Sequence, residues 1–330
     1  MATELVASQD KFPDNSRMSE LTHDTHLIIA GTNKSGTTAV FRYLGDHPAV
    51  ILSKFKESEF FLAPIENCEG DVRERYQSQF LGNDSEPKLF VEATPQYLHG
   101  GITIANRIGS VFPDAKILFV LRNPADRVIS YFRSSHGQPK LPTYGVGFDL
   151  FVSEAIRAMQ VDDTEVDRLT DRERAFRQEL RISRYVQFLP AFVEVFGADN
   201  VLITFFDQLQ SLPRALMNEI CGFVGIDTHA YDDYVFTVEN QTRIHRSTSL
   251  QSISGTLNAR LEPILNRFPS LRRAARHMYD LVNVPHGRQI AIPDESKQHL
   301  EDFFVPWNAK LASWLAEVYP DKPFPGWRTK

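Results

Sequence analysis

The sequence predicts an α/β protein, a single P-loop-like domain in which a central parallel sheet is flanked by helices. Two patterns indicate this fold class. Short apolar runs alternate with segments of helical periodicity along much of the 330 residues, which is typical of strands joined by crossover helices. The first run is also followed by a glycine-rich turn and the start of a helix, the layout of a phosphate-binding loop.

The expected elements follow from these patterns in chain order. Short apolar runs predict strands at 27–30, 50–52, 89–93, 116–121 and 201–205. Helical periodicity and stop signals predict helices at about 37–46, near 103–111, from Pro124, from about 185, at 211–223 and at 303–319. The runs at 89–93 and 116–121 are continuous and not alternating, as expected of parallel strands that are buried on both faces.

The chain reads as one domain preceded by a tail. Residues 1–25 are rich in Ser, Asp, Asn and Thr and predict a flexible N-terminal tail without the apolar segment of a secretory signal, and residues 26–330 form the domain. The chain contains no run of 18 or more apolar residues, so no transmembrane segment is expected. The two cysteines, Cys68 and Cys221, could form one bridge, but so low a number fits a reducing compartment, and we expect a cytoplasmic protein.

The charge balance argues against nucleic acid as a partner. The formal net charge is −6, whereas phosphate neutralisation requires a surplus of Lys and Arg. A local basic stripe nevertheless occurs between 257 and 277, formed by Arg260, Arg267, Arg272, Arg273 and Arg276. A solvated helix face is the preferred interpretation of this stripe, and contact with an acidic acceptor or a membrane surface is the alternative.

The glycine-rich turn departs from the ATP-binding signature in one informative way. Gly31 and Gly36 are five residues apart, as in G-x-x-x-x-G-K-[ST], but Thr37 occupies the lysine position and Lys34 lies inside the loop. In the ATP signature the lysine reaches the β- and γ-phosphates and the hydroxyl holds Mg²⁺. Backbone amides and hydroxyls at the helix start can still hold an anion here, so a phosphate other than that of Mg·ATP is expected.

A second candidate anion site follows the strand at 116–121. Arg122 comes directly after this strand, at the carboxyl edge of the sheet where open α/β sheets bind ligands. Asn123 and Pro124 are suited to cap and start a helix, and Ser130 lies two turns along it. The Arg guanidinium and the Ser hydroxyl can therefore face one phosphate together.

Five segments in chain order form a recognisable set. They read Gly31-Thr-Asn-Lys-Ser-Gly-Thr-Thr38, Lys56-Glu-Ser-Glu-Phe-Phe61, Glu92-Ala-Thr-Pro-Gln-Tyr97, Pro113 to Ser130, and His286-Gly-Arg288. In this order they resemble the 5′-phosphosulfate loop, the K-E-x-x-F-F element, the E-K-S-P-x-Y element, the 3′-phosphate segment and a late K-G-R loop of the PAPS-dependent sulfotransferase family, where PAPS is 3′-phosphoadenosine 5′-phosphosulfate. The K-E-x-x-F-F element points to the carbohydrate and heparan-sulfate branch and its soluble bacterial relatives.

The resemblance implies a donor site and a reaction. PAPS would be the co-substrate, 3′-phosphoadenosine 5′-phosphate the product, and no metal would be needed. The residues implied in donor binding are Lys34, Ser35, Gly36, Thr37, Thr38, Arg122, Ser130, Gly287 and Arg288. Two separate phosphates need two anion sites, and the sequence supplies two.

The resemblance also implies the catalytic groups of an in-line transfer to an acceptor hydroxyl. Glu57 would be the general base, with Lys56 beside it to orient or neutralise. Lys34 would stabilise the leaving phosphate, because a cation helps most where charge develops. Without the surrounding motif, Lys56 and Glu57 would read as an ordinary solvated charge pair.

Three departures from the family pattern affect the acceptor side. Glu59 stands where the branch often has histidine, Ala93 replaces a lysine, and His286 replaces another. Glu59, His99 and His136 are candidate acceptor-site residues, although the two histidines fit ordinary loop or surface positions better. The segments 134–147, read as a loop, and 162–179, read as a charged stretch, are expected to border a pocket for a carbohydrate, lipid or small-molecule acceptor.

Two other functions remain open on the sequence. A metal-dependent nucleotide kinase or NTPase would share the loop, but it would need lysine at position 37 and a Mg²⁺-binding Asp at a strand end. Asp207 follows a strand without such a supporting motif. A non-catalytic binder of 3′,5′-phosphonucleotides would keep Lys34, Arg122 and Ser130 and lack a working base.

Overall fold

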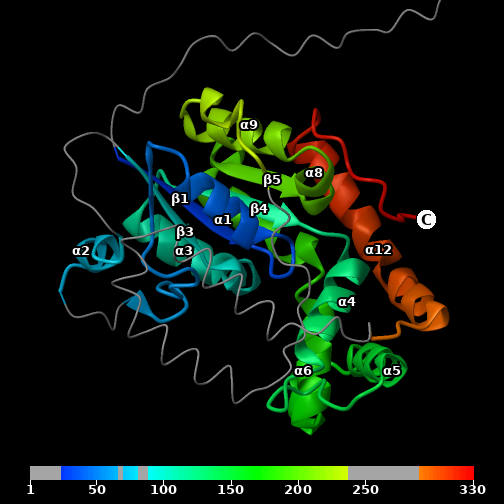
Figure 1. The fold of residues 1–330 in the computed structure, drawn as a ribbon. Coiled ribbons are helices and arrows are strands. Elements are labelled where there is room, and N and C mark those ends of the chain that lie inside the picture. Colours follow the sequence, from blue (N-terminus) through cyan, green and yellow to red (C-terminus); the bar gives the residue numbers. More distant parts are fainter. Residues whose placement is uncertain (1–23, 66–69, 81–87, 237–289) are drawn as a thin grey trace, which may run out of the picture.

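The computed structural model describes residues 24–65, 70–80, 88–236 and 290–330. Its centre is a five-stranded sheet in which every pair is parallel and the strand order is β2-β3-β1-β4-β5 (Figure 1). The strands are β1 (Thr25–Gly31), β2 (Val50–Leu52), β3 (Leu89–Ala93), β4 (Lys116–Leu121) and β5 (Val201–Phe205). The predicted fold class and all five predicted strands are confirmed.

Strand β1 lies in the middle of the sheet, between β3 and β4. Leu27 pairs with Val91 on one side, and Ile28 pairs with Ile117 on the other. The chain leaves β1 toward β2 and β3, and then crosses to the opposite side for β4 and β5. The carboxyl end of β1 is therefore the point where the winding direction reverses, the place where open α/β sheets bind ligands.

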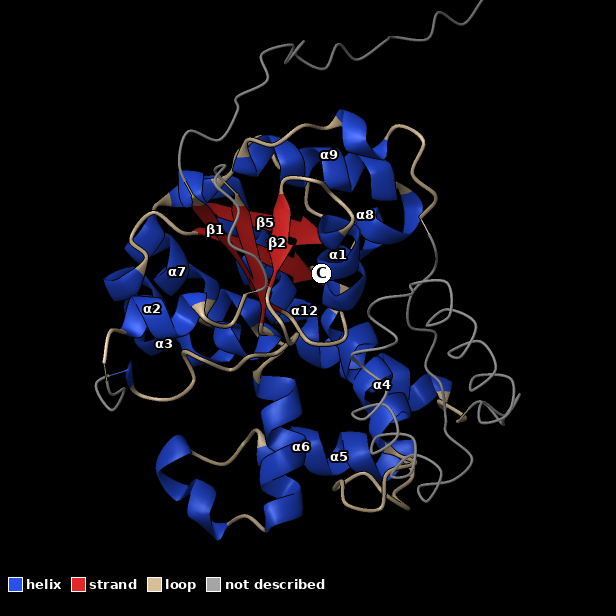
Figure 2. Ribbon diagram, turned by 60° about the vertical axis from the view of Figure 1, so that its left-hand side comes forward, coloured by secondary structure: helices blue, strands red, loops and turns tan. Residues whose placement is uncertain are grey.

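Helices cover both faces of the sheet, as Figure 2 shows. On one face, Leu27 and Ile29 pack in a core with α1 (Thr37–Gly45) and α9 (Pro213–Val224). On the other face, neighbouring β1 residues pack in a core with α3 (Gly101–Val111), α7 (Leu189–Phe196) and part of α12 (Asp294–Val318). Both faces of the strands are buried, which accounts for their continuous apolar runs.

A helical layer extends beyond one end of the sheet. It consists of α4 (Pro124–Ser135), α5 (Phe148–Ala158) and α6 (Asp171–Arg181), with the beginning of α12 packed against it. Both views place α5 beside α6, away from the strands. This layer has its own core, in which the rings of Phe132, Phe151, Phe176 and Phe304 are buried. Since α4 begins where β4 ends, the layer is joined directly to the carboxyl edge of the sheet.

Several predicted helix boundaries were wrong. The charged stretch 162–179 is itself largely helical, because α6 has a capping box between Thr170 and Glu173 and keeps most of its charges on the surface. The single helix expected from 185 is a 3₁₀ turn at Tyr185–Gln187 followed by α7, which starts afresh at its own proline.

Other boundaries differ for similar local reasons. The helix expected at 211–223 is α9, which begins two residues later and ends one residue later than expected, and an additional short helix, α8 (Phe206–Ser211), precedes it. The loop predicted at 134–147 starts two residues later in the structure, because α4 continues through Ser135. The last helix, predicted from 303, already begins at Asp294. The remaining elements are α2 (Val72–Gln77) and 3₁₀ turns at Pro95–Gly100, Asp163–Arg168, Ala198–Asn200 and His229–Tyr231.

Some expectations fall on residues that the structure does not describe. Most of the predicted tail, Cys68 and the basic stripe at 260–276 lie outside the described ranges. The thiol of Cys221 is free and buried. Within the described ranges, none of the helices combines the length and the apolar character that a membrane crossing requires.

His26 occupies an apolar position at the start of β1. Its ring is only 7% exposed and lies against the rings of Tyr76, Phe90 and Phe112. Its Nε2 atom is buried without a hydrogen-bond partner. Burial, with a smaller contribution from the nearby Arg73 guanidinium, lowers the pKa of His26 to about 4.

We expect His26 to make the fold acid-sensitive. Because its folded pKa lies below the unfolded value, the unfolded state binds the extra proton first, and stability is lost as the pH falls from about 6.5 to about 4. His26→Phe should reduce this loss by about 1.4 kcal/mol per pH unit in that window, as measured by urea unfolding at a series of pH values.

His229→Gln is the matched control for this measurement. The ring of His229 is exposed, and its hydrogen bond with Asp232 raises its pKa, the opposite direction. The control should therefore show no reduction in the acid sensitivity. An unchanged pH dependence in His26→Phe would contradict the assignment.

Candidate active site

The loop that follows β1 has the form of an anion-binding turn. Gly36 is the N-cap of α1, with φ 82°, and no side chain caps the amides of the first helical turn. The hydroxyls of Thr32 and Ser35 are buried and have no hydrogen-bond partner among the described residues. Uncapped amides at a helix start, together with its partial positive charge, favour a bound phosphate.

Only glycine fits at position 36. The φ of 82° is a left-handed conformation that side chains rarely adopt. A Cβ atom at this position would also lie 2.4 Å from Leu209 Cδ2 of α8. The loop is therefore pressed against α8, and this close packing fixes the direction in which α1 begins.

The loop and the segment after β4, which the sequence predicts to bind two different phosphates, are joined by a hydrogen bond. Arg122 Nη1 donates to the carbonyl oxygen of Lys34 at 3.0 Å. The Arg122 guanidinium lies over the ring of Phe206 at 4.5 Å, and the Tyr185 hydroxyl donates to the Arg122 carbonyl at 2.8 Å. The structure thus brings Lys34 and Arg122 together at the carboxyl edge of β1 and β4.

The start of α4 forms as the sequence predicts. The side chain of Asn123 accepts hydrogen bonds from the amides of Ala125 and Asp126, and Pro124 opens the helix. Ser130 is partly exposed two turns along α4. Arg122 thus lies just before α4 and Ser130 in the middle of it, and their shared phosphate stays a prediction.

A buried arginine that the sequence reasoning did not single out lies behind these residues. The Arg127 side chain is 0% exposed. Its Nε donates to Ser183 Oγ at 2.7 Å, and its Nη2 donates to Glu179 Oε2 at 2.8 Å. Its Nη1 has no partner. The ion pair with Glu179 ties α4 to α6.

Positive charge exceeds negative charge around the loop. Burial lowers the pKa of Lys34, and the positive charges of Arg122 and Arg127 lower it further. Glu179 and Glu57 oppose this shift with smaller effects. An anion placed beside Lys34 would relieve the repulsion among the three cations, so the arrangement is suited to a negatively charged ligand.

Glu57 lies on a turn beside the end of β3. Its amide donates to the Ala93 carbonyl at 2.8 Å. One carboxylate oxygen accepts from Lys56 Nζ at 2.6 Å, and the other accepts from Gln96 Nε2 at 3.5 Å. The Glu57 side chain remains 43% exposed, so the carboxylate is oriented on both oxygens and still open to a ligand.

Backbone strain is concentrated at the predicted site. Among the described residues, the non-glycine residues with positive φ are Lys34 at 69°, Glu57 at 64° and Glu59 at 57°. Each such conformation costs about 1 kcal/mol or more for an ordinary residue. Residues held in this way are found preferentially at binding and catalytic sites.

The other predicted residues have less uniform surroundings. Glu59 is exposed and His136 packs beside Phe132. His99 is largely buried against Phe188, and burial, followed by the charges of Arg127 and Arg181, lowers its pKa to about 3. His99 is therefore neutral at physiological pH.

The last predictions concern the late loop and the position of Ala93. Gly287 and Arg288 lie outside the described residues. Ala93 is completely buried and leaves no cation at the position where relatives carry lysine.

The structure adds residues that the sequence reasoning missed. Glu92 is the one charged residue of an otherwise apolar predicted strand, 89–93, which is a usable signal for a functional or structural role, whereas Arg127 stands beside other charged residues in its helix and carries no such signal. Glu179 and Gln96 carry no such signal. Glu179 lies 52 residues from Arg127 in the sequence, so only the folded chain shows the pairing.

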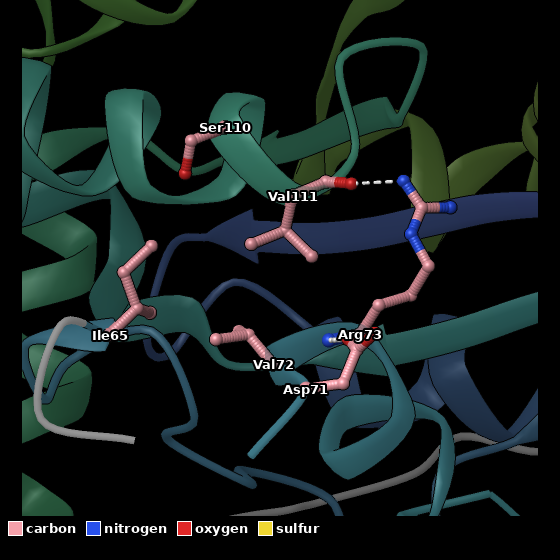
Figure 3. A pocket seen from close by; sticks show the side chains of 6 residues that line it. All are labelled: Ile65, Asp71, Val72, Arg73, Ser110 and Val111. Atoms are coloured by element: carbon pink, nitrogen blue, oxygen red, sulfur yellow. Dashed lines mark hydrogen bonds between the residues drawn. The ribbon is translucent and has the colours of Figure 1, made fainter. Parts of the chain in front are cut away.

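The described residues contain no group of three or more His, Cys, Asp or Glu side chains suited to hold a metal ion. A cavity of about 470 Å³ lies between α2 and the end of α3. Figure 3 shows its lining side chains, among which the Arg73 guanidinium donates to the Val111 carbonyl. Since α3 ends at the amino edge of the sheet, this cavity is remote from the loop after β1.

Together, the switch-point loop, the uncapped helix start and the excess of cations form an α/β site suited to an anion. The sequence profile of the sulfotransferase domain family matches residues 24–266. The chain belongs to the sulfotransferase family.

Named relatives show the same relationship. The chain is 28% identical over 208 residues to the bifunctional heparan sulfate N-deacetylase/N-sulfotransferase 2 of Bos taurus, a match covering 61% of this chain and 22% of that protein. The mouse protein of the same name is 32% identical over 121 residues, 34% of this chain and 13% of that protein. The chain thus spans about a fifth of the length of the curated relatives it matches.

A solved sulfotransferase structure from Alicyclobacillus acidocaldarius aligns with 76% of this chain and 96% of that chain. The TM-score is 0.49 and the sequence identity is 22%.

The buried ion pair between Arg127 and Glu179 should be important for stability. Arg127→Met leaves the Glu179 carboxylate, only 14% exposed, without its partner, which should cost about 3–5 kcal/mol in the free energy of unfolding. The double variant Arg127→Met/Glu179→Leu should recover part of this loss. Urea unfolding measures both.

An exposed arginine provides the matched control for this prediction. Arg168 pairs with Glu165 on the surface and its side chain is 75% exposed, so Arg168→Met should cost less than about 1 kcal/mol. Equal decreases in the free energy of unfolding for Arg127→Met and Arg168→Met would show that the buried ion pair stabilises the fold no more than the surface pair does.

Proposed function

We propose that this sulfotransferase, with residues 26–330 as its domain, transfers the sulfuryl group of PAPS to an acceptor hydroxyl. The observation that supports this best is the contact between Arg122 and the Lys34 carbonyl. It joins two anion-binding segments at the switch point of the sheet, and a donor with separate 5′- and 3′-phosphates requires two such sites.

The residues present fit the two ends of the donor. The amides at the start of α1, with the side chains of Lys34, Ser35, Thr37 and Thr38, would hold the 5′-phosphosulfate. The buried, unpartnered hydroxyl of Ser35 and the uncapped helix start support this assignment. Gly36 allows the close approach of backbone and ligand, since it carries no side chain.

Two residues that follow β4 would hold the other end of the donor. Arg122 and Ser130 would bind the 3′-phosphate, with a charged fork and a neutral donor respectively. Gly287 and Arg288 stay predicted contacts of the same nucleotide.

Lys34 would act on the leaving group. When the bond to sulfur breaks, negative charge develops on the 5′-phosphate, and a fixed cation nearby lowers the barrier. Lys34 lies inside the loop, half-buried and in a strained backbone conformation. Its ammonium group would therefore already be in place beside the leaving phosphate, whereas a surface lysine would first have to change its side-chain conformation. A metal is not required for this role.

Glu57 would take the proton of the acceptor. Its carboxylate is partly exposed and is held by Lys56 and Gln96, which orients it toward an incoming hydroxyl. The exposed side chain of Glu59 on the same turn is a candidate acceptor contact, as are His99 and His136.

A carbohydrate is the first acceptor class to test, because the named relatives act on heparan sulfate. Their name also indicates transfer to nitrogen, so sugars with free amino groups belong in the same screen as sugars with hydroxyls only. Lipid and small-molecule hydroxyl acceptors complete it. We also retain the predicted cytoplasmic location as part of this proposal.

Calorimetric titration with 3′,5′-ADP, 5′-AMP and ATP with Mg²⁺ tests the donor site. We expect a strong preference for 3′,5′-ADP without metal, followed by transfer from PAPS in the acceptor screen. Preference for Mg·ATP would replace the proposal with a nucleotide kinase or NTPase.

Arg122→Ala should weaken binding of 3′,5′-ADP by about 1.5–3 kcal/mol, roughly 10- to 150-fold, because a charge-assisted contact is lost. Binding of 5′-AMP should change much less, and the discrimination between the two nucleotides should disappear. Arg214→Ala, an exposed residue of α9, is the control and should bind both nucleotides as the wild type does. Persistent discrimination in Arg122→Ala would contradict the 3′-phosphate assignment.

Glu57→Gln should bind 3′,5′-ADP normally and lose roughly 10²- to 10⁴-fold in turnover, because the amide cannot accept the acceptor proton. Single-turnover transfer from PAPS measures this effect. Glu59→Gln, on the same strained turn, should lose less. If Glu57→Gln turns over like the wild type, Glu57 is not the base; if neither wild type nor variant transfers, the chain is a non-catalytic nucleotide binder.

A further inference from the structure

Three consecutive backbone amides after Glu57 donate to three side-chain hydroxyls. The amide of Glu59 donates to Thr94 Oγ1 at 3.2 Å. The amide of Phe60 donates to Ser58 Oγ at 3.4 Å. The amide of Phe61 donates to the Tyr97 hydroxyl at 3.1 Å. The turn that carries Glu57 is thus attached to the segment after β3 and to its own Ser58.

All three hydroxyls converge on the same carboxylate oxygen. Ser58, Thr94 and Tyr97 donate to Glu92 Oε1 at 2.6, 2.5 and 3.0 Å. The Tyr76 hydroxyl, from α2, donates to the other oxygen at 3.2 Å. Glu92 is completely buried in β3, so these four hydroxyls replace the water that an exposed carboxylate would bind.

The direction of these hydrogen bonds makes Glu92 the common acceptor of the network. Each of the three hydroxyls already accepts from a backbone amide, so its proton is free to point toward a Glu92 oxygen. Burial raises the pKa of Glu92, and the hydrogen bonds from the four hydroxyls oppose part of that shift. Burial also raises the pKa of Tyr76 and Tyr97, so both hydroxyls keep their protons.

The network supports a turn that would otherwise relax. Glu57 and Glu59, on either side of Ser58, both have left-handed backbone conformations. Such conformations persist only where the surroundings hold them. Ser58 lies between the two strained residues, and its hydroxyl is the side-chain link from this turn to Glu92.

From this geometry we infer that Glu92 is a positioning residue, which sets the place of the Glu57 carboxylate through the hydroxyls of Ser58, Thr94 and Tyr97. The inference rests on the proposed function, in which Glu57 is the base. Glu92 itself does not touch the acceptor, because no part of it is exposed. It holds the turn through buried hydrogen bonds, while the Glu57 side chain remains accessible to an acceptor.

A pair of variants separates positioning from general stability. Ser58→Ala and Tyr76→Phe each remove one hydroxyl donor to Glu92, the first from the turn and the second from α2. Tyr76→Phe keeps the ring that packs against Phe60 and Phe61. Both should lower the melting temperature of the full chain by similar small amounts.

The two variants should differ in catalysis. Ser58→Ala should lower kcat by about tenfold or more, because small displacements of a catalytic group are costly, with the KM for PAPS and the affinity for 3′,5′-ADP unchanged. It should also shift the acid limb of the pH profile of kcat, since Glu57 moves relative to Lys56 and Gln96. Tyr76→Phe should stay within about twofold of wild type in kcat. Ser58→Thr, which retains the hydroxyl, should restore most of the rate.

Glu92→Gln tests the carboxylate directly. It keeps the shape and should bind 3′,5′-ADP like the wild type, because the donor site is built on β1 and β4, while kcat falls at least as far as in Ser58→Ala. If this variant does not fold, the comparison of kcat between Ser58→Ala and Tyr76→Phe still tests the positioning role. Equal kcat values for that pair, or an unmoved pH profile in Ser58→Ala, would overturn the inference.

Failure of the inference can be told from failure of the proposed function. A wild-type chain that binds no 3′,5′-ADP and transfers no sulfuryl group removes the proposed function and the positioning role with it. A wild-type chain that transfers normally, with Ser58→Ala equally active, removes the positioning role alone.

Discussion

The position of β1 between β3 and β4 is the constraint on which the site depends. Parallel strands deliver all of their carboxyl ends to one edge, and the reversal of winding at β1 leaves a gap there that no crossover helix fills. The loop of Lys34, the turn of Glu57 beside β3 and the Arg122 segment after β4 therefore meet. They are far apart in the sequence, and only the strand order makes them neighbours.

Positive charge exceeds negative charge at the carboxyl edge of the sheet, and the charged side chains are held in fixed positions. Lys34, Arg122 and Arg127 repel one another, and Glu179 compensates only part of their charge. The fold tolerates this because Arg127 is buried with Glu179 and Ser183, and Arg122 lies on Phe206. A folded chain that maintains such repulsion gains when an anion binds, so the same feature that costs stability favours a negatively charged ligand.

Local sequence patterns predicted the strands more accurately than the helix boundaries. Continuous apolar runs identified all five strands, because strands buried on both faces admit few polar residues. A helix boundary failed at Pro190, where a proline opens a new helix and does not simply end the old one. The sequence describes the segment before Glu179 only as a charged stretch; in the structure its charges lie largely on the surface of α6, while Phe176 and Leu180 face the core.

The sequence by itself determined the fold class, the glycine-rich turn after β1 with Lys34 inside it, the position of Arg122 at a strand end and, by resemblance, the family. These are local properties, since each depends on residue types at short spacing. Only the tertiary structure decided that Arg127 pairs with Glu179, that Gln96 reaches Glu57, and that three amides of the Glu57 turn are linked to Glu92. These contacts join residues from different elements, and their partners are set by strand order and packing, which no short sequence pattern encodes.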